Sequence, residues 1–359
     1  PGDFVMVAGY PGSTYRFRRA REMRHARDVG YPFRIELDDE LLAILAQHSA
    51  SGDEARARLA NPIGSIENGR KYAQGMLDGF QGSDVVARKE AAEGAVARWI
   101  EADRKRARGY GPAFAELDQM ADEHDRTYKA EVIAGWLLGA DLLRAAWTGW
   151  RWASERERSD LDRDSGYQDR DREARERRLE RMQKTMWTPA DRDSLRALLT
   201  RIAALPIDQR IGPVQAWIDR NGGIDAALER LHDEPALAET KARLALLDLD
   251  REALARSTDP WIELAIALDE YLAPLRELGR ARAGAGLRLQ PLYFEALRAV
   301  APGELYPDAN GTLRVTVGHV KGYSPQDGLV AVPQTTLAGM VAKAGPDPFD
   351  LPQVALDAA

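Results

Sequence analysis

The chain has 359 residues, with 50 lysines and arginines against 57 aspartates and glutamates, a formal charge of −7 and no cysteine. The lack of cysteine excludes a disulfide framework, a thiolate zinc site and a cysteine nucleophile. The acidic balance argues against nucleic acid as a partner, and no uninterrupted apolar run approaches the roughly 20 residues that span a bilayer.

The first residues predict a β-strand. Phe4 to Ala8 is apolar and partly β-branched, and the following Gly9-Tyr10-Pro11-Gly12 favours a tight turn. No earlier strand is available to pair with this one, and Pro1-Gly2-Asp3 shows neither an initiator methionine nor the start of a signal peptide. We therefore expect a buried strand in a segment of a longer protein.

Helical spacing of apolar residues dominates the middle of the chain. It predicts a short helix at Leu37 to His48 and two long helical stretches, from about Ile66 to Ala107 and from Pro112 to Glu157. The sequence Gly109-Tyr110-Gly111-Pro112 between the long stretches is typical of a helix stop, a turn and a new helix start. The two stretches are therefore expected to form a long antiparallel hairpin.

Capping residues mark further helices. Thr188-Pro189 predicts the N-cap and first residue of a helix that runs to Ala204, with an acid at Asp191 in its first turn. Asp259-Pro260 repeats this device before a helix that we expect to run to about Arg282. The Gly-Ala-Gly sequence at 284–286 then reads as a linker between helices.

Charged and aromatic side chains crowd residues 136–184. Ser154 to Lys184 is dense in both signs, and we interpret it as a solvated helical face that is supported by ion pairs and interrupted at Gly166. The four tryptophans in residues 136–152 span several helix faces, which favours core packing over a ligand cage.

The C-terminal part returns to strand patterns. Thr312 to Val317 alternates with a period of two, which predicts a second strand, and Leu329 to Val332 is a candidate for a further short one. The whole pattern predicts a mainly α fold with short β segments at both ends.

Motifs of common catalytic sites are absent from the sequence. There is no Gly-x-Ser-x-Gly elbow, no phosphate-binding GxxxxGK[ST] loop and no GxGxxG after a strand. Two Glu-x-x-His pairs, Glu22 with His25 and Glu229 with His232, have the spacing that builds di-iron sites in helical bundles. A surface histidine beside a glutamate is the commoner outcome, so we expect no metal and no cofactor.

Asn68 stands out within a predicted helix. It is followed by Gly69, and a glycine in a helix interior costs about 1 kcal/mol relative to alanine. A local break near a helix start accounts for the pair structurally, and a functional role for Asn68 is the alternative.

Two stretches carry a family resemblance. The first is Gly2 to Thr14, GDFVMVAGYPGST, and the second runs from Tyr306 through Gly328 to Lys343. Gly166-Tyr167-Gln168 and the segment from Asn68 to Lys71 give intermediate support. In these residues the chain resembles the bacterial dipeptidyl-peptidases of the 7 and 11 types, which are serine exopeptidases with a chymotrypsin-like double β-barrel and a large inserted helical domain.

The resemblance implies a domain organisation. Residues 1–20 and 303–359 would be β segments of the interrupted catalytic barrel, and residues 21–302 the helical cap domain. The histidine and aspartate of the Ser-His-Asp triad would precede residue 1 and the serine would follow residue 359, so no residue of this chain would be catalytic. Asn68 resembles the helical-domain asparagine that holds the substrate's α-ammonium, and Lys71, one turn later, receives a supporting role in substrate binding.

The resemblance therefore implies the helical-domain fragment of a serine dipeptidyl-peptidase that releases dipeptides from the free N-terminus of peptides. The cap would close the cleft, the fragment would be inactive alone, and the parent would be periplasmic and allow a homodimer. Two alternatives stay open: a self-standing helical module that binds a peptide or a protein, and a di-iron helical bundle. Side-chain specificity is not readable from this chain.

Overall fold

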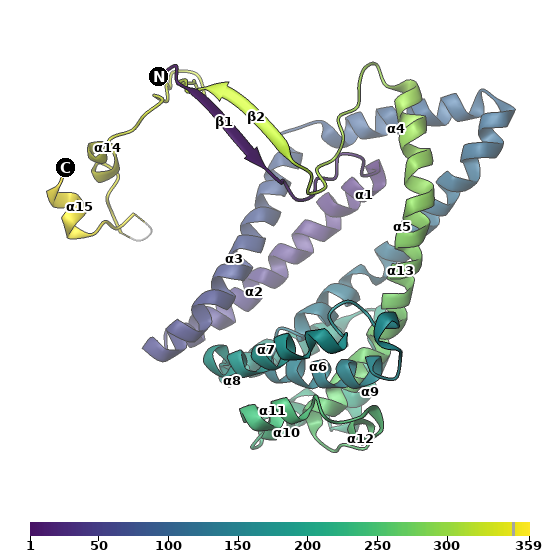
Figure 1. Cartoon of the computed structure of the whole chain (residues 1–359), viewed down its shortest axis with the longest axis vertical. Helices are drawn as coiled ribbons and strands as arrows, with labels where there is room; N and C mark the ends of the chain where they lie inside the picture. The colour runs from purple at the N-terminus through teal and green to yellow at the C-terminus, as the bar shows by residue number, and fades with distance from the viewer. Residues whose placement is uncertain (347–348) are drawn as a thin grey trace. The chain divides into compact units, whose positions relative to one another are not determined.

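Helices form most of the chain, as the apolar periodicity predicts (Figure 1). The structure is a computed structural model that describes residues 1–346 and 349–359. The chain divides into two compact units, one of Pro1–Phe17 with Leu305–Ala359 and the other of Arg18–Glu304. A mainly α fold with short β segments near both ends is thus confirmed, whereas the assignment of residues 1–20 and 303–359 to a catalytic barrel stays a prediction.

The smaller unit is built on a two-stranded antiparallel ribbon. Strand β1 (Phe4–Gly9) pairs with β2 (Arg314–His319), with Met6 opposite Val317. Both predicted strands are confirmed, but the expected burial of the first is wrong, because Phe4 is 63% and Val7 69% exposed. The expected short strand at 329–332 is an isolated bridge between Tyr323 and Ala331. Two short helices follow, α14 (Leu337–Val341) and α15 (Gln353–Asp357).

The larger unit consists of helices joined by loops. Its α-helices are α1 (Ala20–His25), α2 (Tyr31–Ser49), α3 (Asp53–Gln81), α4 (Val85–Glu101), α5 (Arg104–Leu137), α6 (Asp141–Glu155), α7 (Arg172–Thr185), α8 (Thr188–Ala204), α9 (Gly212–Arg220), α10 (Ile224–His232), α11 (Thr240–Ala245), α12 (Arg251–Ala255) and α13 (Pro260–Val300). A five-residue π-helical segment, η1 (Ala26–Gly30), joins α1 to α2 without a break. No helix in the described part of the chain is long and apolar enough to cross a membrane.

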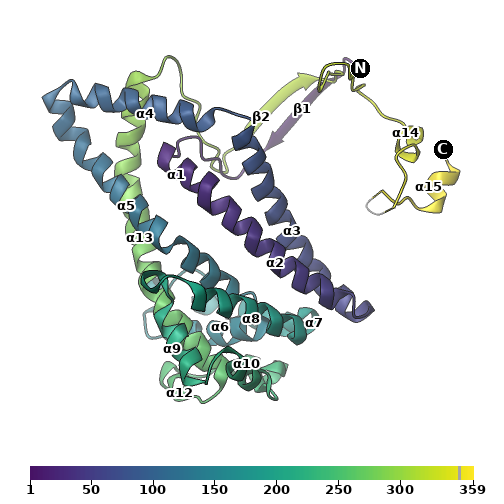
Figure 2. The same cartoon turned by 180° about the vertical axis from the view of Figure 1, so that it is seen from behind.

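Helices α2 and α3 form a long antiparallel hairpin and lie side by side in both views (Figures 1 and 2). Leu37, Leu41 and Leu45 recur at a spacing of four on α2 and are buried, together with Leu59 and Ile66 of α3. The short helix expected at 37–48 is confirmed, and it begins six residues earlier, at Tyr31.

The hairpin expected around Gly109-Tyr110-Gly111-Pro112 is wrong, because these residues lie inside the continuous helix α5. The side chain of Asp103 accepts hydrogen bonds from the backbone N–H groups of Lys105 and Arg106, which fixes the helix start before the glycines. Tyr110 then packs on Trp99 of α4, with ring centroids 5.4 Å apart. The stretch expected from Ile66 to Ala107 accordingly covers the end of α3, the whole of α4 and the start of α5, with breaks at residues 82–84 and 102–103.

Two predicted helix starts have different outcomes. Asp259 caps α13 by accepting from the N–H groups of Trp261 and Ile262, as expected, but the helix continues through residues 284–286 to Val300, so the linker predicted there is wrong. Helix α8 spans Thr188–Ala204 as predicted, but Trp187 occupies the N-cap and no side chain caps it.

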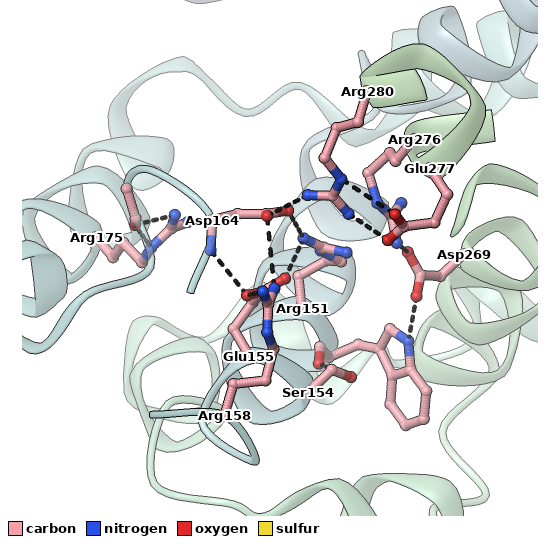
Figure 3. Close-up of polar contacts among 12 residues, drawn as sticks. Arg151, Ser154, Glu155, Arg158, Asp164, Arg175, Asp269, Arg276, Glu277 and Arg280 are labelled. Carbon is pink, nitrogen blue, oxygen red and sulfur yellow. Dashed lines mark hydrogen bonds and ion pairs between the residues drawn. The ribbon is translucent and has the colours of Figure 1, made fainter. Parts of the chain in front are cut away.

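The charged segment after Trp152 differs in part from the sequence-based expectation. Helix α6 ends at Glu155, and residues 156–171 form a loop with two short 3-10 turns, so the helix expected from Ser154 to Lys184 is confirmed only in its second half, α7. Arg151 and Glu155 are buried under this loop and bond to each other, and Asp164 of the loop accepts from Arg151 at 2.9 Å (Figure 3). Trp150 and Trp152 are buried in the core, as predicted.

Candidate functional site

Asn68 and Lys71 lie one turn apart on α3, and both are exposed. Lys71 is 76% exposed, and its Nζ lies 3.7 Å from Oε2 of Glu67. The carboxamide of Asn68 offers a carbonyl acceptor and an NH₂ donor. An exposed amide on a rigid helix is therefore available to a ligand at this point of the hairpin.

Contacts on the opposite side of the same turn explain why residue 69 is a glycine. A Cβ atom at Gly69 would lie 2.9 Å from Nη2 of Arg34 and 3.8 Å from Oδ2 of Asp38. Nε of Arg34 lies 2.7 Å from both carboxylate oxygens of the fully buried Asp38, and its guanidinium stacks over Trp136 at 4.8 Å. The glycine makes room for this ion pair between α2 and α3, so Gly69 is a packing residue.

Asp38 is fully buried and bonds to Arg34 of the same helix, α2. Burial raises the pKa of its carboxyl, and the hydrogen bonds and charge of Arg34 oppose this rise. The i,i+4 spacing of Arg34 and Asp38 was the sequence signal for this pair. The sequence alone does not show that Trp136 and Gly69 complete the cluster.

Two exposed glycines of α3 lie one turn before and two turns after Asn68. Gly64 and Gly75 are exposed, and a Cβ atom at either would meet nothing within 4 Å. Tyr72, one turn after Asn68, is exposed and packs edge-on against Tyr31, with ring centroids 6.1 Å apart. This arrangement leaves the Asn68 amide open to approach from one side of the hairpin.

The histidines do not form a nucleophilic centre in the described residues. His25 contacts Asp125 at 2.9 Å and His48 contacts Asp193 at 2.8 Å, but no serine hydroxyl of the described residues hydrogen-bonds to either imidazole. The hydroxyl of Ser51, close in sequence, donates instead to the backbone carbonyl of His48.

The two Glu-x-x-His pairs are not brought together as a metal site. Within residues 1–346 and 349–359 no group of three or more metal-binding side chains is positioned to hold an ion. His25 packs against His124 and Tyr128, and Nδ1 of His232 lies 2.9 Å from the backbone oxygen of Leu228. The arrangement thus gives the di-iron alternative no support.

A cavity of about 540 Å³ lies elsewhere in the larger unit, between α9 and α13. Its polar lining comes from Arg220, Ser257, Glu263 and Glu270, and Glu263 is already paired with Arg230 at 2.7 Å. None of its lining residues belongs to α3, so it is separate from the candidate site.

Comparisons with known proteins agree along the whole chain. The family described as Peptidase S46 matches residues 1–359. The chain is 31% identical to the Asp/Glu-specific dipeptidyl-peptidase of Shewanella putrefaciens, covering 99% of this chain and 49% of that protein. It is 27% identical to dipeptidyl-peptidase 7 of Porphyromonas gingivalis, again covering 99% of this chain and 49% of that protein.

A solved structure shows the same fold. The crystal structure of Porphyromonas endodontalis DPP11 in complex with the dipeptide Arg-Glu matches with a TM-score of 0.70 at 22% identity, covering 99% of this chain and 51% of that chain. The chain therefore spans about half the length of the curated relatives it matches.

Proposed function

The chain belongs to the peptidase S46 family, and from this premise we propose that it supplies the helical region of a serine-type dipeptidyl-peptidase that releases dipeptides from the free N-terminus of peptides. The names of the curated relatives support this activity, since they are dipeptidyl-peptidases. The proposal includes a Ser-His-Asp triad on polypeptide outside residues 1–359, a periplasmic location and a parent able to form a homodimer. Residues 1–359 alone would then be inactive.

The observation that carries the site assignment is the exposed amide of Asn68 on the open face of α3. Its carbonyl oxygen is suited to accept a hydrogen bond from the substrate's α-ammonium. A fixed anchor for the ammonium sets the distance to the scissile bond, so that cleavage follows the second residue. The helical region would close over the cleft and bring this anchor to the peptide.

Lys71 has a supporting role in this proposal. Its ammonium would repel the ammonium of a substrate at short range, and Glu67 partly offsets its charge. We therefore assign the contact with the substrate amine to Asn68 and place Lys71 at the edge of the site.

The exposed apolar ribbon disfavours the alternative of a self-standing binding module. Phe4 and Met6 on one face of β1 and Val7 on the other are each more than half exposed, as is Val317 of β2. Apolar strands exposed on both faces are a liability for an independent protein and suit a sheet that continues in further strands.

The experiment compares Asn68→Ala with Asn61→Ala in the full-length protein that contains these residues. Asn61 is also an exposed asparagine of α3, two turns earlier, and is the matched control. A hydrogen bond to a charged group is worth about 1.5 to 3 kcal/mol, so kcat/KM of the Asn68 variant should fall about ten- to hundredfold. Unchanged kinetics in that variant would remove the site assignment, and absence of dipeptide release by the wild type would remove the function.

A further inference from the structure

The segment that joins α1 to the α2–α3 hairpin has an unusual helical geometry. The run from Ala20 to Ser49 is continuous, but its middle, η1 (Ala26–Gly30), is π-helical, and Tyr31 donates its N–H to the carbonyl of Ala26 five residues back. A single π turn inside α-helix is strained relative to its surroundings and is frequent at functional sites. Its geometry sets the direction in which α2 leaves α1.

Tyr128 of α5 packs on both sides of this π turn. Its ring lies 4.9 Å from that of His25, just before the turn, and 6.4 Å from that of Phe33, just after it. Its hydroxyl donates to the carbonyl of Gly30 at 3.3 Å. Gly30 is buried, and a Cβ atom there would lie 3.3 Å from the same hydroxyl. One phenol thus contacts the turn itself and the helices on either side of it.

The imidazole of His25, which packs on Tyr128, also has contacts that do not involve Tyr128. Nδ1 of His25 lies 2.9 Å from a carboxylate oxygen of Asp125, and the His124 ring packs against both His25 and Tyr128. Arg21 reaches the same carboxylate group of Asp125 from α1. The ring packing around the π turn therefore has other supports, and the contribution specific to Tyr128 is its hydroxyl on Gly30.

The π turn is connected to Gly69, the neighbour of Asn68, through Arg34 of α2. Arg34, one turn into α2, stacks over Trp136 of α5, eight residues beyond Tyr128. The same guanidinium lies against Gly69, the residue next to Asn68. The start of α2 thus contacts α5 at two points that lie about two turns apart along α5, and α3 contacts α2 at the second of these points.

We infer that Tyr128 is a positioning residue that orients the α2–α3 hairpin, through the π turn, so that Asn68 meets the substrate amine. This inference rests on the proposed function of Asn68. Loss of the hydroxyl leaves the ring packing in place but releases the Gly30 carbonyl, so the hairpin populates orientations in which Asn68 is displaced. Apparent substrate affinity then falls in proportion to the fraction of molecules in which the site is competent.

The test is Tyr128→Phe in the full-length protein, with Tyr110→Phe as the matched control. Tyr110 is another tyrosine of α5 whose hydroxyl makes an exposed hydrogen bond of similar length, to Glu295 at 3.4 Å and not to the π turn. We expect KM for peptides with a free N-terminus to rise about two- to tenfold in the Tyr128 variant, with kcat changed less than about twofold. The control should keep the KM of the wild type, and the two variants should unfold at the same temperature.

A double-mutant cycle separates positioning from general destabilisation. If Tyr128 acts through Asn68, the effect of Tyr128→Phe on KM disappears in the Asn68→Ala background. An unchanged KM in the single variant, or the same KM effect in both backgrounds, overturns the inference. If the wild type releases dipeptides and Asn68→Ala impairs it while Tyr128→Phe does not, the proposed function stands and only this inference fails.

Discussion

The guanidinium of Arg34 lies against the bare Cα of Gly69, and this contact joins the two helices of the hairpin that carries Asn68. Arg34 cannot move away freely, because Asp38 binds its Nε and Trp136 lies under its guanidinium plane. The glycine therefore lowers helix propensity at this position of α3 and leaves room for the Arg34–Asp38 ion pair of α2.

Gly69→Ala is expected to be less stable than Gly64→Ala. A Cβ atom at Gly64 meets nothing within 4 Å, so alanine there should raise the free energy of unfolding by up to about 1 kcal/mol through helix propensity. At Gly69 the new methyl group displaces Arg34, and the gain should be cancelled or reversed. Urea unfolding followed by far-UV circular dichroism measures both, and equal stabilisation of the two variants would contradict the contact.

Arg34→Ala should destabilise the hairpin much more than a surface substitution. It leaves Asp38 buried without its partner, which costs about 3 to 5 kcal/mol when the carboxyl is charged. Burial already raises the pKa of Asp38 above its unfolded value, so the cost is largest at neutral pH and shrinks as pH falls toward the unfolded pKa. The urea midpoints of the variant and the wild type should therefore differ more at about pH 7 than at about pH 4.

A variant in which both partners are neutral provides the control for that prediction. Arg34→Met combined with Asp38→Leu removes both charges and retains bulk, so it should recover most of the stability lost in Arg34→Ala. A double variant as unstable as the single one would show that the loss comes from packing on Trp136 and not from the unpaired carboxylate.

Helix starts and ends were predictable where a local side chain decides them. Asp259 binds the N–H groups of its own helix, and the sequence Asp259-Pro260 shows this directly. The break predicted at Gly109 to Pro112 failed because tertiary contacts outweigh local propensity there: Tyr110 packs on Trp99 and Ala113 is buried. Glycine and proline penalties of about 1 and 3 kcal/mol are of the size that such burial offsets.

The candidate site was predictable only in part, for a similar reason. Asn68 entered through a family resemblance, and its neighbour Gly69 looked like a helix break. The residue that contacts Gly69 is Arg34, which lies 35 residues earlier, so no local sequence pattern connects Arg34 with Gly69. The same holds for the loop at 156–171, whose charges look solvated in sequence but cover the buried Arg151 and Glu155.

Tyr167→Leu should loosen that loop. Tyr167 is buried, and its ring is contacted by two guanidinium groups, Arg175 at 3.7 Å and Arg151 at 5.1 Å from the ring centroid. Each cation–π contact is worth about 0.5 to 2 kcal/mol, so the loop should open about tenfold more often. Limited trypsin digestion should cut the variant correspondingly faster after Arg158 or Arg163.

Leu161→Ala is the matched control for the loop, because Leu161 lies in the same segment and is 88% exposed. Its tryptic cleavage rate should equal that of the wild type. If both variants are cut equally fast, Tyr167 does not fasten the loop.

The pair Asp141 and Asp191 should make stability fall as pH rises. Oδ2 of Asp191 accepts from the backbone N–H of Asp141 at 3.1 Å, which caps the first turn of α6 from another helix. Burial, with a further contribution from the Asp141 carboxylate, raises the pKa of Asp191 to about 8. Because this value lies above the unfolded one, the stabilising contribution is complete below about pH 4 and is lost as pH rises through about 8.

Asp191→Asn should remove this dependence, since asparagine keeps a carbonyl acceptor for the Asp141 N–H and does not titrate. Between about pH 5 and 8 the wild type should lose on the order of 1 kcal/mol or more relative to this variant, measured as the free energy of unfolding in urea. Asp53→Asn, at an exposed position in the first turn of α3, is the matched control for an aspartate-to-asparagine change elsewhere in the protein. Parallel stability profiles for the wild type and Asp191→Asn would show that Asp191 is charged in the folded protein at neutral pH, and that the cap of α6 does not depend on its proton.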